Sequence, residues 1–322
     1  MAKTILLTDH IFDDLDIERE ITSAAGVDLI ERDVETPEAV NEAIAETDPD
    51  ALAVAYARIP RSVLESADGL QAVGRYGIGV DTVDVPAATE TGTVVVNVPS
   101  YSVDEVSTHA LALVLACARS ITTYDRDGKD GGWDWRVGAP ITRLSESTLG
   151  LVGFGKIPRR VAEKADGFGF DVLAYDPYVD ADEMAEFGVD KVTLEELLDR
   201  SDFVSVHTPL TEETRGLLGE AAFERMKKSA ILVNTARGAI VDVEALHAAL
   251  NTGKLAGAGL DVLPEEPPVD EPIVDREDVI VSPHAAWYSE ASIVELRETL
   301  FSDLVGILDG EEPKNPVNPE VL

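Results

Sequence analysis

Short apolar runs alternate with segments of helical spacing along the first third of the 322-residue chain. The runs have the length of strands, and the polar segments between them have the length of helices. Strands that alternate with helices form parallel sheets covered on both faces, so the pattern predicts a doubly wound α/β unit. The expected strands are Ile5–Thr8, Val27–Ile30, Leu52–Tyr56, Gln71–Val73 and Val94–Val98, with helices at Thr36–Glu46 and Arg61–Ala67.

A second series of the same kind begins near Ser147, after a long Ala- and Leu-rich helical pattern over Ser102–Arg119. Between them, Thr122–Pro140 contains Trp133 and Trp135, and it predicts a surface excursion or an oligomer contact. The expected strands of the second series are Leu149–Val152, Val172–Tyr175, Phe203–His207, Ile231–Asn234, Ala258–Val262 and Val279–Ser282. The expected helices are Arg159–Phe168, Leu194–Arg200, Val243–Thr252 and Ser289–Leu308.

The chain is longer than one hydrophobic core usually supports, so two domains are expected. The last helix follows the final strand of the second series and can cross back to the first. We therefore expect one discontinuous domain of residues 1–100 and 290–322, and a second domain of residues 101–289. Both are predicted to be Rossmann-like α/β domains with parallel sheets.

The charge balance sets this chain apart, because 62 Asp and Glu face 26 Lys and Arg, for a net charge of −36. Such a charge repels itself in dilute buffer, whereas molar salt shortens the Debye length to about 3 Å and screens the repulsion. We therefore expect a halophilic protein that works in a salty cytoplasm. Nucleic acids and anionic membranes need a positive patch and are not expected as partners.

Other parts of the composition narrow the picture further. Residues Met1–Thr4 lead directly into a strand, and no apolar run reaches ~18 residues, so neither a signal peptide nor a membrane span is expected. Cys117 is the single cysteine and is expected to be a core residue. The five His show no metal-ligand spacing, so no catalytic metal is expected.

A Gly-rich turn opens the second series. Gly153 would permit a tight turn after a strand, and Gly155 would let the backbone approach a pyrophosphate at a helix N-terminus. The third position of the pattern holds Pro158 instead of Gly, which a first helical turn tolerates. A strand before the turn and a helix after it favour dinucleotide binding over a plain turn.

Asp176 ends the next expected strand, about 20 residues after the turn. A carboxylate there accepts hydrogen bonds from the adenosine ribose and repels a 2′-phosphate, which favours NAD over NADP. The alternative reading is a turn residue before Pro177. Arg159 and Arg160 keep NADP open.

Three polar residues, Arg237, Glu266 and His284, each stand just after an expected strand. The carboxyl ends of parallel strands meet at one edge of a sheet, so these side chains are expected to converge. A His suits proton delivery near neutral pH, and a carboxylate beside it stabilises the imidazolium. A guanidinium can hold a substrate carboxylate and polarise a keto oxygen. The set indicates reduction of a 2-keto acid by hydride transfer.

With these motifs the whole chain resembles the D-isomer-specific 2-hydroxyacid dehydrogenase family. The resemblance rests on motifs that are specific together and weak alone. They are Gly77-Ile78-Gly79-Val80-Asp81, Asn97-Val98-Pro99, His109, Gly153-Phe154-Gly155-Lys156-Ile157, His207-Thr208-Pro209-Leu210-Thr211, Asn234-Thr235-Ala236-Arg237-Gly238, Glu266-Pro267 and Ser282-Pro283-His284.

The resemblance implies a role for individual residues. Arg237 would bind substrate, His284 would exchange the proton, and Glu266 would be its partner. The backbone of Gly77 and Ile78 would hold the substrate carboxylate. The cofactor would lie along Gly153, Phe154, Gly155, Lys156, Ile157, Asp176, Thr235, Ala236 and Asp261, with Thr108 and Pro209 as weaker contacts. The family also implies that the discontinuous domain binds substrate, that residues 101–289 bind the dinucleotide, and that the protein is a homodimer.

Tyr101 and Trp287 flank the expected crevice and are interpreted as pocket walls, with plain core packing as the alternative. His207 could be a second acid, although a cofactor contact or a structural role is favoured, and His109 is expected to be a satisfied core residue.

Three other functions compete with this prediction. A cofactor-sensing binding protein of the co-repressor type could use the same fold, and turnover would distinguish the two. A phosphoglycerate dehydrogenase usually carries an extra regulatory domain, whereas this chain ends soon after its last expected helix. A formate dehydrogenase is expected to differ at the Glu266 position. A D-2-hydroxyacid dehydrogenase that uses NAD(P) therefore remains the prediction.

Overall fold

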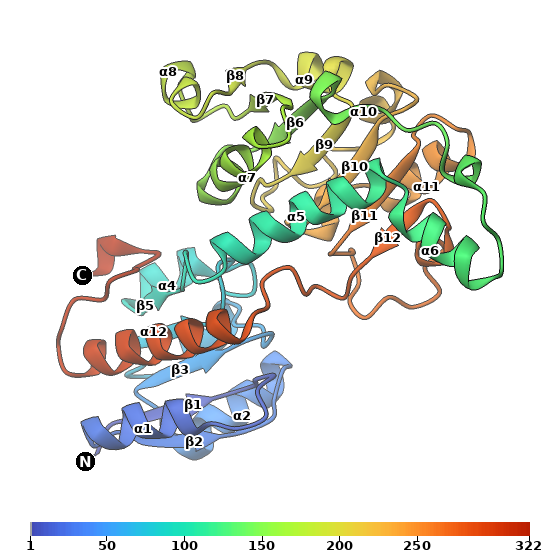
Figure 1. Ribbon diagram of the computed structural model, residues 1–322. Helices are drawn as coiled ribbons and strands as arrows, with labels where there is room; N and C mark the ends of the chain where they lie inside the picture. The colour runs from blue at the N-terminus through green and yellow to red at the C-terminus, as the bar shows by residue number, and fades with distance from the viewer. Residues whose placement is uncertain (1) are drawn as a thin grey trace. The chain divides into compact units, whose positions relative to one another are not determined.

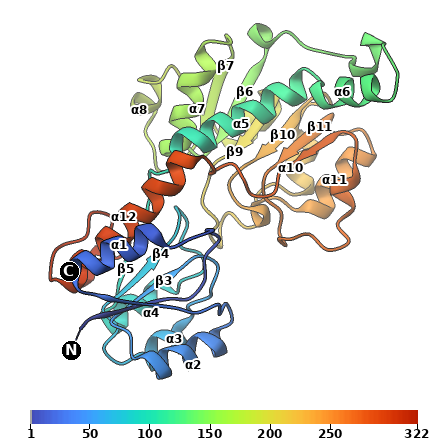
Figure 2. The same cartoon turned by 60° about the horizontal axis from the view of Figure 1, so that its bottom comes forward.

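The computed structural model describes residues 2–322, which divide into two compact units (Figures 1 and 2). Unit 1 comprises the chain up to Ser102 together with Ser289–Leu322, and unit 2 comprises Val103–Tyr288. Each unit contains one parallel sheet with helices packed against it. The predicted fold class of two parallel α/β sheets is therefore confirmed.

The sheet of unit 1 has the strand order β2-β1-β3-β4-β5, and all four pairings are parallel. Apolar side chains of α2, α3 and α4 pack on one face of it. On the other, α12 packs directly on β4 at Gly74, where a Cβ would lie 2.9 Å from Leu304 Cδ1. The strands are β1 Thr4–Leu7, β2 Asp28–Glu31, β3 Ala51–Val54, β4 Ala72–Arg75 and β5 Val94–Val96. The helices are α1 Asp16–Ala25, α2 Pro37–Thr47, α3 Arg61–Ser66, α4 Val85–Thr91 and α12 Glu290–Leu308.

Helix α1 has no counterpart among the predicted elements. Its sequence is mostly polar, and the residues that it buries are Glu18 and Thr22. Ile17, Ile21, Ala24 and Ala25 nevertheless recur at the i, i+4, i+7 and i+8 spacing of an amphipathic helix, so the prediction overlooked a helix whose signal the sequence carries. Helix α1 lies beside α12, and Arg297 of α12 donates to both carboxylate oxygens of Glu18, at 2.8 and 2.6 Å.

The C-terminal tail covers the free edge of β5. Val317 donates from its backbone to Val95, and Val95 donates in turn to the side chain of Asn318 at 2.7 Å. Asn318 is fully buried. The tail thereby satisfies an edge that would otherwise present unpaired backbone groups.

The sheet of unit 2 has the order β12-β11-β10-β9-β6-β7-β8, again with parallel pairings. The chain builds the sheet outward from β6 in one direction through β7 and β8, and then in the other direction from β9 to β12, so the strand order reverses between β6 and β9. In such sheets ligands bind beyond the carboxyl ends of the strands at the point of reversal. The strands are β6 Thr148–Val152, β7 Asp171–Tyr175, β8 Asp190–Lys191, β9 Phe203–Val206, β10 Ile231–Asn234, β11 Gly257–Leu260 and β12 Val279–Val281. The helices are α5 Val103–Ala118, α6 Ile121–Lys129, α7 Lys156–Asp166, α8 Ala181–Ala185, α9 Leu194–Arg200, α10 Glu220–Arg225 and α11 Val243–Asn251.

Several segments of unit 2 differ from the prediction, and α8, β8 and α10 have no counterpart among the predicted elements. The helix after the Gly-rich turn begins at Lys156 instead of Arg159, so Pro158 is its third residue and is buried. Pro needs no N–H in the first turn of a helix, which explains why it does not delay the start. Helix α6 and a 3₁₀ turn at Trp135–Gly138 lie within the predicted excursion, and α6 buries none of its residues.

Across residues 2–322, no single helix is both long and apolar enough to cross a membrane. Helices α5 and α6 pass that test only as a pair, bent by 60°, on length and composition alone.

Candidate active site

The turn after β6 depends on Gly153 for two separate reasons. Its φ of +97° lies in the region that only glycine adopts readily. A Cβ there would also lie 2.9 Å from the carbonyl carbon of His207. The backbone after β6 and the backbone after β9 therefore meet at this glycine, directly at the reversal of the sheet.

Gly155 has no comparable need within the protein. It is the N-cap of α7 with φ −79° and ψ −159°, and a Cβ built on it would meet no atom within 4 Å. No side chain caps the helix, whose first N–H groups have no partner inside it. An open, uncapped N-terminus of an 11-residue helix fits a bound pyrophosphate.

Asp176 closes the turn from the end of β7. One of its oxygens accepts the N–H of Phe154 at 2.8 Å, and the other accepts the N–H of Tyr178 at 2.9 Å. These two hydrogen bonds give Asp176 the role of a turn residue, which was the alternative interpretation from the sequence. Each carboxylate oxygen can accept a further hydrogen bond, so contact with a ribose hydroxyl stays a prediction.

The two arginines that kept NADP open are both engaged in ion pairs. Arg159 lies 2.6 Å from Glu183 and stacks over Phe154 at 5.5 Å. Arg160 contacts Asp104 at 2.9 Å. Phe154 itself is fully buried and its side chain lies in the core of unit 2, so a cofactor contact of its backbone stays a prediction. Lys156 is exposed, and Ile157 packs partly against the same core.

The loop after β10 is held together by Asn234. Its side chain accepts from the N–H of Ala236 at 3.0 Å and donates to the carbonyl of Arg237 at 2.9 Å. Gly238 is required here, because a Cβ would lie 2.0 Å from the backbone of Leu263. The hydroxyl of Thr235 is buried and has no hydrogen-bond partner within the protein. Such an orphaned polar atom beside the switch point fits a ligand contact.

His284 and Glu266 form a hydrogen-bonded pair in the loops that follow β12 and β11. His284 Nδ1 lies 2.6 Å from Glu266 Oε2, while Glu266 Oε1 accepts the N–H of Leu263 at 2.8 Å. Burial alone would raise the pKa of Glu266, but the hydrogen bond and charge of His284, the Leu263 amide and the charge of Arg237 lower it below its ordinary value. The site therefore holds an ionised Glu266, and both its oxygens are used.

The backbone of His284 has φ +52°, which is unusual for a residue with a side chain. This left-handed conformation costs about 1 to 3 kcal/mol and persists only where the surroundings enforce it. Asp261 enforces it here. The Asp261 carboxylate accepts the N–H groups of Ala285 and Ala286, at 2.9 and 3.0 Å, and its carbonyl accepts the N–H of His284 at 2.8 Å. Sequence reasoning placed Asp261 along the cofactor and missed this role.

In unit 1, Gly77 and Ile78 follow the carboxyl end of β4. Gly77 has φ +136°, and a Cβ there would overlap the guanidinium of Arg75. The carbonyl of Ile78 accepts from the Asn97 side chain, which gives the Asn97 motif a structural purpose. Tyr101 is 8% exposed, so it packs in unit 1, and its contact with a substrate stays a prediction.

The remaining predicted contacts are placed as follows. The Thr108 hydroxyl lies in α5, where it donates to the Asp104 carbonyl and accepts from Lys164 at 2.6 Å. Pro209 is exposed after β9, and Trp287 stacks edge-on against Tyr288. Burial lowers the pKa of His207 to about 3, and its Nε2 lies 2.9 Å from the Ser205 hydroxyl, which favours a structural role over that of a second acid.

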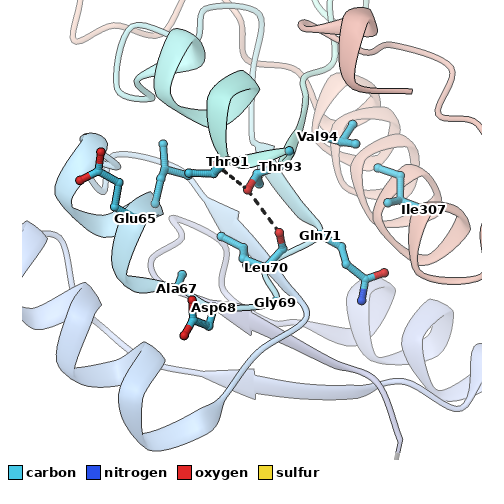
Figure 3. A pocket seen from close by; sticks show the side chains of 12 residues that line it. Glu65, Ala67, Asp68, Gly69, Leu70, Gln71, Thr91, Thr93, Val94 and Ile307 are labelled. Atoms are coloured by element: carbon cyan, nitrogen blue, oxygen red, sulfur yellow. Dashed lines mark hydrogen bonds between the residues drawn. The ribbon is translucent and has the colours of Figure 1, made fainter.

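No group of three His, Cys, Asp or Glu within residues 2–322 could hold a metal ion. Unit 1 also contains a cavity of about 490 Å³ at the amino ends of β4 and β5 (Figure 3). The hydroxyls of Thr91 and Thr93 bond each other at 3.1 Å, and Thr93 bonds the Leu70 carbonyl. This cavity therefore lies at the amino ends of the strands, whereas Gly77 follows the carboxyl end of β4.

Comparison with known proteins identifies the family to which this sequence is similar. The family model for the NAD binding domain of D-isomer specific 2-hydroxyacid dehydrogenases matches residues 111–286. A glyoxylate reductase from Korarchaeum cryptofilum is 43% identical over 271 residues, which cover 82% of this chain and 81% of that protein. A D-3-phosphoglycerate dehydrogenase from Methanocaldococcus jannaschii is 38% identical over 98% of this chain, which spans only 59% of that longer protein.

Two solved structures have a similar fold over nearly the full length of this chain. The D-lactate dehydrogenase from Aquifex aeolicus, solved with NAD and lactic acid, has a TM-score of 0.88 at 26% identity, with 97% of this chain and 98% of that chain covered. A glyoxylate reductase from Paecilomyes thermophila also reaches 0.88, at 27% identity and 99% coverage of both chains.

Proposed function

This chain belongs to the D-isomer-specific 2-hydroxyacid dehydrogenase family, and on that premise we propose that it reduces 2-keto acids to D-2-hydroxy acids with NAD(P)H. The observation that carries the proposal is the 2.6 Å hydrogen bond between His284 and Glu266, with Arg237 close enough for its charge to lower the pKa of Glu266. A proton donor, its carboxylate partner and a cation at one sheet edge are what reduction of a keto acid needs.

The cofactor would be held by groups whose hydrogen-bonding capacity the protein leaves wholly or partly unused. The uncapped N-terminus of α7 at Gly155 would take the pyrophosphate, the open acceptor sites of Asp176 would take the ribose, and the Thr235 hydroxyl would contact the nicotinamide half. When bound there, the nicotinamide supplies the hydride.

His284 delivers the proton to the developing alkoxide. The Glu266 carboxylate can only accept, so the proton in the 2.6 Å bond belongs to His284 Nδ1. Nε2 is then the atom that faces the substrate and gives up a proton from the imidazolium. Because Leu263 fixes the other oxygen of Glu266, the carboxylate also sets the orientation of the ring.

Arg237 acts on the substrate itself. A guanidinium presents parallel N–H groups, so it can hold the carboxylate and draw electron density from the keto oxygen at once. The Asn234 side chain accepts a hydrogen bond from the Ala236 N–H and donates one to the Arg237 carbonyl. These two bonds fix the backbone from which the Arg237 side chain extends.

The first experiment is to follow nicotinamide absorbance with NADH and NADPH against glyoxylate, pyruvate and 3-phosphohydroxypyruvate in molar potassium chloride. We expect glyoxylate to be favoured, in line with the 43% identical relative named glyoxylate reductase. His284→Ala should lower kcat by about 10²- to 10⁴-fold and leave NADH affinity nearly unchanged. Tight NADH binding with no turnover of any acid would replace the dehydrogenase with the cofactor-sensing protein.

NAD is the proposed cofactor over NADP. The charge of Asp176 opposes a 2′-phosphate, and Arg159 and Arg160 are already paired with acids. Asp176→Asn keeps acceptor oxygen for the Phe154 amide but removes the charge. The NADH-to-NADPH ratio of kcat/KM should then fall by about tenfold, the equivalent of ~1.4 kcal/mol. An unchanged ratio would assign the preference to other residues.

We also propose that the protein is a homodimer adapted to a salty cytoplasm. Helix α6 and the segment after it leave Ile121, Trp133, Trp135 and Val137 exposed, from 42% to 98%, and neighbouring exposed apolar side chains mark association surfaces. Light scattering in molar potassium chloride should give twice the mass of one chain. The double substitution Trp133→Ser and Trp135→Ser should give one chain mass.

Lowering the salt should reduce the melting temperature, because the charge of −36 is then unscreened.

A further inference from the structure

Helix α5 carries a histidine whose ring reaches the loop that holds His284. His109 Nε2 lies 2.8 Å from the Ser282 hydroxyl and 3.5 Å from the nearer oxygen of Asp261. Its side chain is 29% exposed. The sequence-based reading of His109 as a satisfied core residue is therefore correct about its hydrogen bond and wrong about its surroundings, because the ring contacts the functional loop.

The direction of these hydrogen bonds follows from proton counting. The Asp261 carboxylate accepts, so the 2.6 Å bond between Ser282 and Asp261 uses the one proton of the Ser282 hydroxyl. Ser282 can then only accept from His109, and the proton between them belongs to His109 Nε2. The relay therefore runs from His109 to Ser282 to Asp261, whether His109 is neutral or charged.

Asp261 is the point at which this relay meets the catalytic loop. It is 2% exposed, and the same oxygen that accepts from Ser282 also accepts the N–H of Ala285. The left-handed backbone of His284 lies between these two contacts. A loop in a costly conformation depends on every contact that enforces it, and His109 extends those contacts to helix α5.

We propose that His109 is a positioning residue for proton transfer. Its Nε2–H orients the Ser282 hydroxyl, and Ser282 with Asp261 keeps His284 in the conformation in which Nδ1 meets Glu266 and Nε2 faces the substrate. This inference rests on the proposed function, in which His284 is the proton donor.

The test compares substitutions that keep or remove a donor at the position of Nε2. His109→Leu should lower kcat by about ten- to a hundredfold, as expected when a catalytic group is misplaced by a fraction of an ångström to 1 Å. NADH affinity should stay within about twofold, because the relay touches no predicted cofactor group except Asp261. His109→Gln should recover most of kcat, since its amide nitrogen extends as far as imidazole Nε2. His109→Asn, whose nitrogen corresponds to Nδ1, should not.

A double-mutant cycle tests the route through Ser282. If His109 acts through that hydroxyl, His109→Leu should cost little more once Ser282→Ala is present, whereas independent roles would make the two losses multiply. His247→Leu is the matched control, because it removes a histidine from helix α11, where the ring lies 3.5 Å from the Asn251 amide nitrogen. It should leave kcat unchanged.

Carbethoxylation of His284 by diethyl pyrocarbonate, measured by peptide mass, gives a readout without turnover. His109→Leu should change that rate and His109→Gln should not. If the wild type binds NADH but turns over no acid, the proposed function fails while this comparison still tests the relay. The proposal would be overturned if His109→Leu kept the wild-type kcat, or if His109→Gln and His109→Asn lowered kcat equally. It would also be overturned if the losses of kcat from His109→Leu and Ser282→Ala multiplied in the double variant. If the Leu variant does not fold, the Gln and Asn pair decides.

Discussion

The buried ion pair of unit 1 permits a quantitative prediction that is independent of catalysis. Glu18 is fully buried and Arg297 is 6% exposed. Glu18 accepts two charged hydrogen bonds from Arg297, at 2.8 and 2.6 Å, and one from the Tyr76 hydroxyl at 2.9 Å. Arg297→Met removes both charged bonds and leaves a carboxylate in the interior with one neutral donor. Breaking such a pair from one side costs about 3 to 5 kcal/mol.

Urea unfolding in molar potassium chloride, followed by circular dichroism, measures this loss. Arg143→Met is the matched control, because Arg143 pairs with Glu146 on the surface, where both side chains are mostly exposed. It should change the free energy of unfolding by less than about 1 kcal/mol. Glu18→Met combined with Arg297→Met should be more stable than Arg297→Met alone, since no charge is then left buried.

Salt gives a further check on the same pair. A buried pair is screened far less than a surface pair, so the loss in Arg297→Met should persist as potassium chloride is raised. Hydrogen exchange should increase in peptides of α1 and α12. A loss below about 1 kcal/mol, or a double variant less stable than the single one, would refute the reasoning.

Three further predictions concern unit 2. Gly153→Ala should lose NADH binding and stability, because it combines φ +97° with a Cβ 2.9 Å from the His207 backbone; fluorescence titration and melting would measure both. Burial raises the pKa of Cys117 to about 12, so native protein at pH 8 should resist iodoacetamide that labels it in urea. The pKa of Glu266 is lowered in the folded state, so its ion pair stabilises the fold above the ordinary carboxyl pKa and is lost as pH falls through the lowered value. Glu266→Gln should therefore be less stable than wild type at pH 7, and the difference in melting temperature should vanish in acid.

Several features of this protein could be derived from the chain alone. Apolar runs of strand length alternate with helical spacing, so both parallel sheets follow from residues that are near neighbours in sequence. Gly153 and Gly155 are informative in the same local way, because a turn between a strand and a helix restricts which residues it accepts. Arg237, Glu266 and His284 could be placed together because parallel strands end at one edge of a sheet.

The tertiary structure alone decided the pairings of buried polar groups. Glu18 meets its partner Arg297 across 279 residues, so the sequence around Glu18 gives no sign of this pair. His109 meets Ser282 across 173 residues, and Asn318 satisfies an edge strand 223 residues earlier. A polar side chain carries the same sequence signal whether it faces water or a distant partner. Local preferences and hydropathy therefore determine the elements and their order, whereas the identity of each buried polar contact depends on which distant segments the fold brings together.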